Sequence, residues 1–187
     1  MSINEHIFDK FPILESKRLL FRNFTKNDAQ NIFLIRSDIR VMKFMNSTIP
    51  QTIQDSEEKI FEIQKAFKEQ KAITWVIIDK STDTLIGDFS FWRLDKQNCR
   101  GEIGYALSPD YWRKGLMTET MNTLICFGFE KMNLHSIEAN TNPKNEKSQQ
   151  LLEKYGFKKE AHFRENYFYG GKFLDSIIYS LLKSDVE

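Results

Sequence analysis

The sequence predicts an α+β, or mixed α/β, fold in which one sheet carries helices on its faces. Segments with the apolar period of helices alternate with β-rich segments in the order β-α-α-β-β-β-α-β-α-β-β. The chain has 187 residues, of which 41% are hydrophobic and 28% charged, and it contains no repeat or linker-like tract. A chain of this size buries a sufficient core without disulfides or metals. We therefore expect a single domain over residues 1–187.

The N-terminal third predicts one strand and two helices. Leu19–Phe21 is the first apolar segment of strand type. Each helix follows a Thr and an Asp three positions apart, Thr25 with Asp28 and Thr52 with Asp55, which is the spacing of an N-capping pair. Apolar residues at helical spacing come next. They are Ile32, Phe33 and Ile35 in the first helix, and Ile53, Ile60, Ile63 and Phe67 in the second.

The middle third predicts an antiparallel meander of three strands. Residues 73–78 and 85–92 are rich in β-formers and are joined by turn-type residues. A third strand is predicted over residues 101–107. Alternation along this strand puts every second side chain on one face. The residues of one face are Glu102, Gly104 and Ala106.

The C-terminal part predicts two helices and three strands. A helical pattern begins near Gly115, and a short helix with Gly156 as its C-cap comes later. Two glycines between alternating apolar segments predict a final hairpin. In order, the further segments are a strand over 137–141, a helix over 145–155, and strands over 163–168 and 173–182.

Charge and hydropathy exclude several classes of function. The net charge of +1 argues against a nucleic-acid or membrane-surface partner. The longest apolar run, residues 73–78, is far shorter than the ~20 residues of a membrane span. Residues 1–6 lack the pattern of a secretory signal. We therefore expect a cytoplasmic protein without a membrane or direct nucleic-acid partner.

The cysteines, histidines and aromatic clusters give weak functional signals. Cys99 and Cys126 have neither zinc nor redox spacing and no histidine pair accompanies them, so we expect reduced core thiols and no metal site. The aromatic clusters 91–92 and 167–169 are expected to pack in the core. The alternative is that Trp92 or Tyr167 forms a wall of a substrate pocket.

The segment from Glu102 to Glu119 carries the strongest functional signal. A strand ends, a short loop follows, and a helix opens at Gly115, directly after Arg113 and Lys114. Free backbone N–H groups at a helix start, together with the helix dipole, form an anion site. The GxxxxGK[ST] and GxGxxG patterns are absent. Taken alone, the loop is equally compatible with an ordinary helix start that carries solvated basic residues.

This segment resembles motif A of the GNAT acyltransferase superfamily, with the signature [Q/R]-x-x-G-x-[A/G], and most of all its RimJ/RimL branch. There the loop commonly reads Tyr-Trp-Gly-Lys-Gly-x-x-Thr-Glu-Ala, and here it reads Tyr111-Trp112-Arg113-Lys114-Gly115-Leu116-Met117-Thr118-Glu119-Thr120. The resemblance spans about residues 13–183 and implies the GNAT fold, a mostly antiparallel seven-stranded sheet with helices on both faces. Further matches are Arg18-Leu19-Leu20, residues 145–148, residues 151–157, Arg164, Gly170-Gly171-Lys172, Asp175 and residues 179–182.

The resemblance implies an acetyl-CoA:amine N-acetyltransferase that transfers acetyl directly from acetyl-CoA to an amine. It assigns the pantetheine arm to polar contacts on two strands, with Ala106 and Leu107 on one side and Asn140 and Asn145 on the other. A backbone N–H near Ala106 would bind the oxyanion, and such donors are worth ~2.7–4 kcal/mol. The backbone N–H groups assigned to the pyrophosphate are those of Arg113, Lys114, Gly115, Leu116, Met117 and Thr118.

Three positions depart from the family pattern. Arg113 replaces the loop glycine, which the loop tolerates if this residue keeps a negative φ and donates only its N–H. Trp112 occupies the position of Gln or Arg. Leu152 stands where many members carry a tyrosine that protonates the leaving thiolate. That acid is absent here, as it often is in the RimJ/RimL branch.

The reaction needs a base for the amine and a hydrogen-bond donor for the sulfur. Glu102 is predicted to face the reacting centre as the base, and the alternative is a strand glutamate paired with Arg100. Glu165, near the last hairpin, is a second acid for which a structural role is favoured. Ser148, one turn into the late helix, is predicted to hydrogen-bond the departing sulfur. Its alternative role is ordinary capping with Asn145.

The acceptor is inferred from the pKa of amines. An α-amine titrates near 7.7–8.0 and a lysine side chain near 10.4, so the α-amine deprotonates more easily. We therefore predict a protein or peptide N-terminus as acceptor, such as that of a ribosomal protein. The alternatives are an N-acetyltransferase of a small amine or antibiotic, and a non-catalytic acyl-CoA-binding module. The sequence leaves open whether the chain is a monomer or a homodimer.

Overall fold

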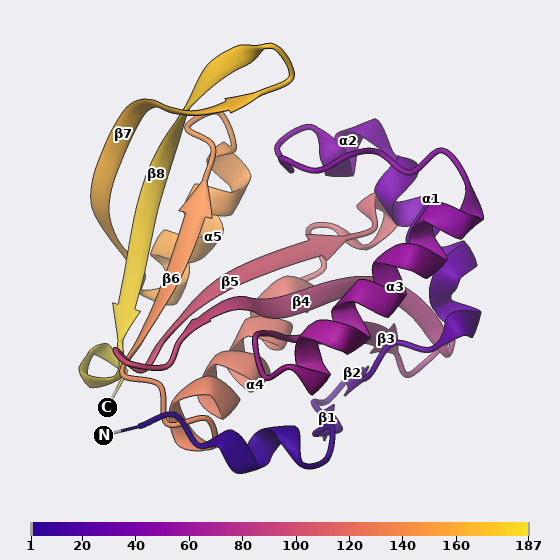
Figure 1. Cartoon of the computed structure of the whole chain (residues 1–187), viewed down its shortest axis with the longest axis horizontal. Coiled ribbons are helices and arrows are strands. Elements are labelled where there is room, and N and C mark those ends of the chain that lie inside the picture. Colours follow the sequence, from indigo (N-terminus) through magenta and orange to yellow (C-terminus); the bar gives the residue numbers. More distant parts are fainter. Residues whose placement is uncertain (1, 187) are drawn as a thin grey trace.

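The computed structural model describes residues 2–186, and within them eight strands form one sheet in the order β1-β2-β3-β4-β5-β6-β8-β7 (Figure 1). Neighbouring strands run antiparallel except β5 and β6, which are parallel. The strands are β1 (Leu14–Glu15), β2 (Leu19–Arg22), β3 (Ile73–Asp79), β4 (Thr84–Asp95), β5 (Arg100–Leu107), β6 (Ser136–Thr141), β7 (Lys158–Tyr169) and β8 (Lys172–Leu182).

The predicted mixed α/β, mostly antiparallel sheet is confirmed, with one strand more than expected. The additional strand is β1, in which only Leu14 and Glu15 pair with Phe21 and Leu20. Two residues are too few to show the alternation by which a strand is recognised in a sequence. The predicted count of seven therefore omits it.

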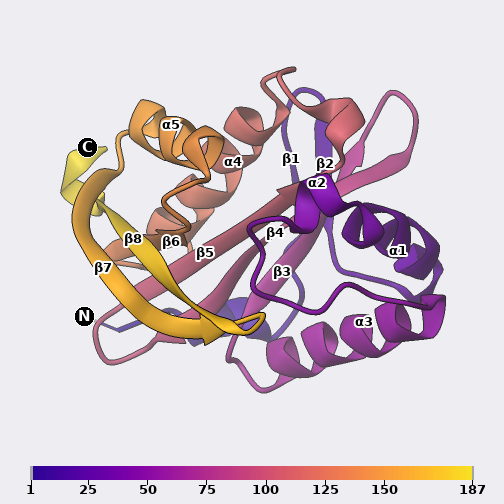
Figure 2. The same cartoon turned by 90° about the horizontal axis from the view of Figure 1, so that it is seen from above.

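Helices cover both faces of the sheet, as expected. Alternate residues of β3 serve opposite faces: Trp75 packs in the core under α4 and α5, whereas Val76 packs in a second core with α1 and α3. Figure 2 shows these two pairs of helices on opposite sides of the strands. The α-helices are α1 (Ala29–Ser37), α2 (Ile39–Met42), α3 (Ile53–Lys68), α4 (Leu116–Glu130) and α5 (Glu146–Tyr155).

The predicted capping residues lie at the helix ends. Thr52 Oγ1 accepts a hydrogen bond from the N–H of Asp55 at 3.2 Å, and the Asp55 carboxylate accepts one from the N–H of Thr52 at 3.0 Å. Gly156 ends α5 with φ +106°, a conformation that glycine adopts without penalty. These helix boundaries therefore follow from local sequence.

Several residues predicted to lie in the core are exposed. Cys99 is buried, but Cys126 is exposed on α4, so the expectation of two core thiols is wrong for Cys126. Trp92 is 50% exposed because it is the extra residue of a β-bulge in β4 and is skipped in the pairing with β5. Phe168 is 62% exposed because it lies near the tip of the β7–β8 hairpin, beyond the core.

The parallel strands β5 and β6 pair over only part of their length. Their register runs from Arg100 opposite Ser136 to Ile103 opposite Ala139 and then stops. Beyond that point β5 pairs only with β4, and β6 only with β8. Figure 1 shows the two strands diverging, with β6, β7 and β8 forming an arm that leaves the rest of the sheet. The divergence ends the pairing between the two parts of the sheet after Ile103 and Ala139.

Candidate active site

The loop between β5 and α4 contains two left-handed residues. Arg113 has φ +61° and Gly115 has φ +73°, whereas Lys114 between them has a negative φ. Such alternation turns successive N–H groups toward one side and forms a concave nest for an anion. The condition of a negative φ at Arg113 is not met. The loop keeps the turn for which glycine is the usual residue, and Arg113 adopts it at some conformational cost.

The helix that follows extends this nest. Leu116, Met117 and Thr118 are the first three residues of α4, and such N–H groups have no partner within their helix. The helix has 15 residues, and its dipole adds partial positive charge at the same end. We call residues 113–118 the anion cradle. Its donors are backbone groups, so most of its side chains are free to pack elsewhere, as the buried Leu116 does.

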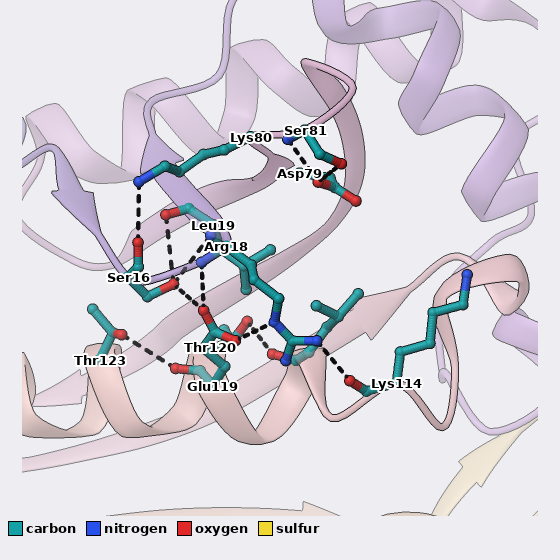
Figure 3. A network of polar contacts seen from close by, with 11 residues as sticks. Ser16, Arg18, Leu19, Asp79, Lys80, Ser81, Lys114, Glu119, Thr120 and Thr123 are labelled. Carbon is teal, nitrogen blue, oxygen red and sulfur yellow. Dashed lines mark hydrogen bonds and ion pairs between the residues drawn. The ribbon is translucent and has the colours of Figure 1, made fainter.

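Arg18 and Glu119 hold the cradle in place (Figure 3). Arg18 Nε donates to Glu119 Oε2 at 2.6 Å, and Arg18 Nη1 donates to the carbonyl oxygen of Lys114 at 2.9 Å. The N–H of Arg18 and the hydroxyl of Ser16 both donate to Glu119 Oε1 at 2.8 Å. Burial alone would raise the pKa of Glu119, but these hydrogen bonds outweigh it and lower the pKa. The charged carboxylate thus ties the turn between β1 and β2 to the loop.

Basic side chains lie on one side of the cradle. A hollow of about 420 Å³ beside it is lined by Lys17, Arg18, Lys80 and Lys114, together with Asp79, Ser81, Tyr111 and Leu116. A second hollow of about 270 Å³ lies between α4 and α5, where Thr118 and Lys154 are among its lining residues. The excess of cations favours an anionic ligand.

The other residues predicted to bind the cofactor lie where β5 and β6 diverge. Ala106 and Leu107 are buried at the end of β5, and the carbonyl oxygen of Leu107 accepts a hydrogen bond from Trp112 Nε1 at 2.7 Å. Asn140 is exposed on β6, and Asn145 is the N-cap of α5. The four residues thus lie near the ends of β5 and β6 and at the start of α5.

Glu102 lies on the opposite face of β5 from α4, only 7% exposed. Its neighbour across the parallel register is Glu138, and Arg93 Nη1 lies 3.8 Å from Glu102 Oε2. Burial raises the pKa of Glu102 to about 7, and the charge of Glu138 adds to this shift against the opposing charges of Arg93 and Arg100. Arg100 pairs with Glu138, whereas Glu102 pairs with Arg93, so the alternative of a salt-bridged strand glutamate is present in the structure with Arg93 in place of Arg100.

The two predicted roles of Ser148 use different groups, the backbone N–H for capping and the side-chain hydroxyl for the sulfur. Its backbone N–H donates to Asn145 Oδ1 at 3.3 Å, which is the expected cap. Its hydroxyl lies 2.8 Å from the hydroxyl of Tyr105 on β5. Burial raises the pKa of Tyr105 to about 12, so this phenol stays protonated at neutral pH. Leu152, at the family's tyrosine position, is 1% exposed and packs in the core.

The β7–β8 hairpin and the segment before α3 meet on the Glu102 side. The hydroxyl of Tyr169 donates to the carbonyl oxygen of Ser47 at 2.7 Å, and that of Tyr167 lies 3.5 Å from Asn46 Oδ1. Glu165 is exposed in β7 with φ +49°, and its N–H donates to Asp175 Oδ1 at 2.9 Å. This hydrogen bond uses the backbone of Glu165, so the structural role favoured for its carboxylate stays a prediction.

Sequence reasoning missed Tyr105 and Glu138 as members of this region. Both come from the register of β5 against β6 and α5, which joins residues about 35–45 positions apart and leaves no local pattern. The alternation along β5 did indicate that Tyr105 and Glu102 face opposite sides. The alternation could not predict that Tyr105 meets Ser148 on one side and that Glu102 meets Glu138 on the other.

The fold is that of the GNAT class that the sequence resembles. The family described as acetyltransferase (GNAT) domain matches residues 18–158 of this chain. The chain therefore belongs to the GNAT family of N-acetyltransferases, whose acetyl donor is acetyl-CoA.

Similar proteins of known sequence or structure agree with this assignment. "Uncharacterized N-acetyltransferase p20" of Bacillus licheniformis is 36% identical over 172 residues, covering 92% of this chain and 97% of that protein. "Uncharacterized N-acetyltransferase YoaA" of Bacillus subtilis is 34% identical over 173 residues, covering 92% of this chain and 98% of that protein. The crystal structure of a GNAT acetyltransferase from Bacillus anthracis superposes with a TM-score of 0.82 at 25% identity, covering 94% and 100% of the two chains.

Two more distant relatives have names that state their acceptors. The [ribosomal protein uS5]-alanine N-acetyltransferase of Escherichia coli is 26% identical over 124 residues, covering 66% of this chain and 64% of that protein. The spermidine N(1)-acetyltransferase of Vibrio cholerae is 22% identical over 148 residues, covering 76% and 86%. The acceptors of these relatives differ in chemistry.

The described residues contain neither a metal-binding cluster nor a membrane-spanning helix. Among residues 2–186 no group of three or more His, Cys, Asp or Glu side chains is arranged to hold a metal ion. Over the same range no helix has the length and apolar character needed to cross a membrane.

Proposed function

We propose that this chain acts as a single GNAT domain over residues 1–187 and transfers acetyl from acetyl-CoA to an N-terminal α-amine of a protein or peptide. The observation that carries the proposal is the buried carboxyl of Glu102, with a pKa of about 7, beside the point where β5 and β6 diverge. The relative named [ribosomal protein uS5]-alanine N-acetyltransferase supports a protein as the acceptor.

The roles of the cofactor-binding residues follow from where their polar groups lie. The anion cradle offers backbone N–H groups to the pyrophosphate, and Lys114 adds positive charge. Ala106, Leu107, Asn140 and Asn145 are proposed to contact the pantetheine arm between the diverging strands. Acetyl-CoA supplies the acetyl group. The chain itself supplies orientation and hydrogen-bond donors.

Glu102 is proposed as the general base for the acceptor amine. A base works best when its pKa lies near the working pH, and Glu102 at about 7 meets this condition. The difference from an α-amine is about one pKa unit, whereas a lysine amine lies more than about three units higher. Proton transfer to Glu102 is therefore far easier from an α-amine. The acceptor class is inferred from this match.

Ser148 is proposed to stabilise the sulfur that leaves. The nitrogen–carbon bond forms as the carbon–sulfur bond breaks, the amine proton passes to Glu102, and the sulfur departs as a thiolate. A hydroxyl that donates to this anion lowers the barrier, as other preorganised donors do. Ser148 lies on the α5 side of β5, opposite Glu102, so the two groups act on different sides of the reacting carbon.

The test is a turnover assay that measures released CoA with three sets of acceptors. One set has free N-termini and no lysine, the second has blocked N-termini and one lysine, and the third consists of polyamines. We expect turnover with the first set at least tenfold above the other two. A preference for lysine peptides or polyamines would overturn the acceptor class.

A binding measurement separates the enzyme from a binding module. Calorimetry that shows acetyl-CoA binding without CoA release from any set would favour a non-catalytic acyl-CoA-binding module and would overturn catalysis. A ribosomal or nascent-chain acceptor also implies a cytoplasmic location, which forms part of the proposal. The proposed reaction is compatible with a monomer and with a homodimer.

A further inference from the structure

The contact between Tyr105 and Ser148 joins two elements at the point where the sheet opens. Tyr105 lies on β5 two residues beyond the last pair with β6, and Ser148 lies in the first turn of α5. Their hydroxyl oxygens are 2.8 Å apart. The ring of Tyr105 stacks on Phe89, with centroids 6.3 Å apart and planes 11° apart, so its hydroxyl has a fixed direction.

Among the described residues, no other tyrosine hydroxyl forms a hydrogen bond with the hydroxyl of Ser148. The hydroxyl of Tyr155 donates to the carbonyl oxygen of Met121 at 3.3 Å, and that of Tyr179 donates to Glu153 Oε1 at 2.8 Å. Within residues 2–186 the hydroxyl of Tyr105 has Ser148 as its single hydrogen-bond partner. A pair of hydroxyls therefore stands in the region where the buried Leu152 offers no polar group.

We propose that Tyr105 is a positioning residue that orients the hydroxyl of Ser148 toward the sulfur of CoA. This inference rests on the proposed function of Ser148. A serine hydroxyl has one hydrogen, so when it donates to sulfur its oxygen can only accept from Tyr105. Tyr105 then donates to Ser148, and Ser148 donates to the thiolate. The reverse direction would leave Ser148 without a hydrogen for the sulfur.

The proton balance requires no transfer from Tyr105. The amine proton goes to Glu102, the thiolate leaves with two successive hydrogen bonds behind it, and it later takes a proton from water. A thiol titrates at about 8.5, well below a buried phenol, so the phenol keeps its proton. The pair thus stabilises the anion by hydrogen bonding, and chains of such bonds strengthen one another.

The pKa of the thiol of bound CoA tests this arrangement without turnover. The ultraviolet absorbance of the thiolate, followed through a pH titration of the binary complex with CoA, gives this pKa directly. Tyr105→Phe and Ser148→Ala should each raise it, with a thiolate-to-thiol ratio at fixed pH about tenfold lower than in the unmodified protein. The double variant should equal Ser148→Ala, because Tyr105 acts only through Ser148.

Tyr179→Phe is the matched control. It removes another buried phenol that also bonds to α5, through Glu153, and it should leave the thiol pKa unchanged. In the acetyl transfer, Tyr105→Phe should lower kcat about tenfold with KM for acetyl-CoA within about twofold.

Several outcomes would overturn the inference. An unchanged thiol pKa in folded Tyr105→Phe would do so, as would an equal shift in Tyr179→Phe or independent effects in the double variant. If the parent protein acetylates α-amines and Tyr105→Phe has the same thiol pKa and kcat, the role of Tyr105 is overturned and the proposed function is retained. A parent protein that binds no CoA would overturn both.

Discussion

The proposed cofactor side and the proposed acceptor side of the site are built in different ways. On the cofactor side the anion cradle consists of backbone N–H groups from one segment, held by Arg18 and Glu119 through bonds of 2.6–2.9 Å. On the acceptor side the groups are side chains from separate strands. They include Glu102, Glu138 and Arg93, with Tyr167 and Tyr169 on the last hairpin.

This difference shows which parts of the site tolerate change. A cradle of backbone groups depends on local conformation, so it tolerates new side chains but not a new φ angle. A surface made of side chains changes its chemistry with each substitution. The same family fold can therefore keep one donor while relatives are named for acceptors as different as a ribosomal protein and spermidine.

The largest expected effect falls on the acceptor side, at Glu102. Glu102→Gln should lower kcat/KM at pH 7 by about 10²-fold or more, because general-base catalysis contributes that much. The loss should shrink as the pH approaches 9, where the α-amine is already deprotonated. A pH–rate profile of both proteins measures this. A loss that does not change with pH would make Glu102 a positioning residue.

Glu138→Gln serves as the control for this prediction, since it removes the neighbouring charge and keeps the base. The charge of Glu138 raises the pKa of Glu102, so its removal should lower that pKa. The acid limb of the rate profile should then move to lower pH, with the maximal rate retained.

The same residue should make stability depend on pH. The folded-state pKa of Glu102, about 7, lies above the ordinary glutamate value of 4.5, so ionisation penalises the folded state as the pH rises through this window. Glu102→Gln removes the penalty. Relative to the unmodified protein, the variant should gain unfolding free energy, and this gain should be about 2–3 kcal/mol larger at pH 8 than at pH 5. Urea denaturation at the two pH values checks this, and equal gains would contradict a raised pKa.

On the cofactor side the largest expected effect is at Gly115. Valine cannot easily adopt φ +73°, whereas an added Cβ would meet only Arg18 Nη2, at 3.7 Å. A valine at this position should therefore weaken binding through backbone strain, which turns the N–H groups away. Its side chain would not fill the cradle. Gly115→Val should weaken acetyl-CoA binding at least about tenfold in calorimetry, with the circular dichroism spectrum largely kept.

Gly170→Val is the matched control for this strain. Gly170 has φ +59° at the tip of the last hairpin, and nothing lies within 4 Å of an added Cβ. It should lose stability in the same way and keep its acetyl-CoA affinity. Equal loss of affinity in both variants would remove the cradle from the binding site.

A smaller effect is expected at Asn145. Asn145→Ala removes the cap of α5 and should cost about 1 kcal/mol of stability. Because Asn145 is also proposed to contact the pantetheine arm, the affinity for acetyl-CoA should fall as well. Thr52→Ala removes a similar cap from α3, far from the cradle, and should reduce stability alone. Unchanged affinity in Asn145→Ala would restrict the residue to capping.

The smallest effect is expected at Arg113, and it is a gain. A left-handed φ costs a non-glycine residue about 1–2 kcal/mol, and Arg113→Gly removes this cost. Glycine loses more entropy on folding, which offsets about 0.5–1 kcal/mol of the gain. Stability should rise by about 0.5–1 kcal/mol, since the side chain has no hydrogen-bond or ion-pair partner among the described residues. Affinity for acetyl-CoA should stay within about twofold because the N–H remains. A tenfold loss would show direct contact by the guanidinium.

The elements that the sequence determined are those with local signals. The capping pairs at Thr25 and Thr52, the glycine after α5 and the alternation along β3 to β5 each arise between residues a few positions apart. The cradle belongs to this group because one loop and one helix start form it. The family motif lies in the same segment, so the donor and the reaction class could be inferred before the structure.

The tertiary structure decided what depends on long-range register. The hydrogen bond of Tyr105 with Ser148, the closeness of Glu138 to Glu102 and the tie of Arg18 to Glu119 each join residues at least 36 positions apart. The bulge that exposes Trp92 and the left-handed φ of Arg113 are also outcomes of packing and loop closure. Pairing energies between distant segments fix these contacts, and a local sequence pattern carries no information about them.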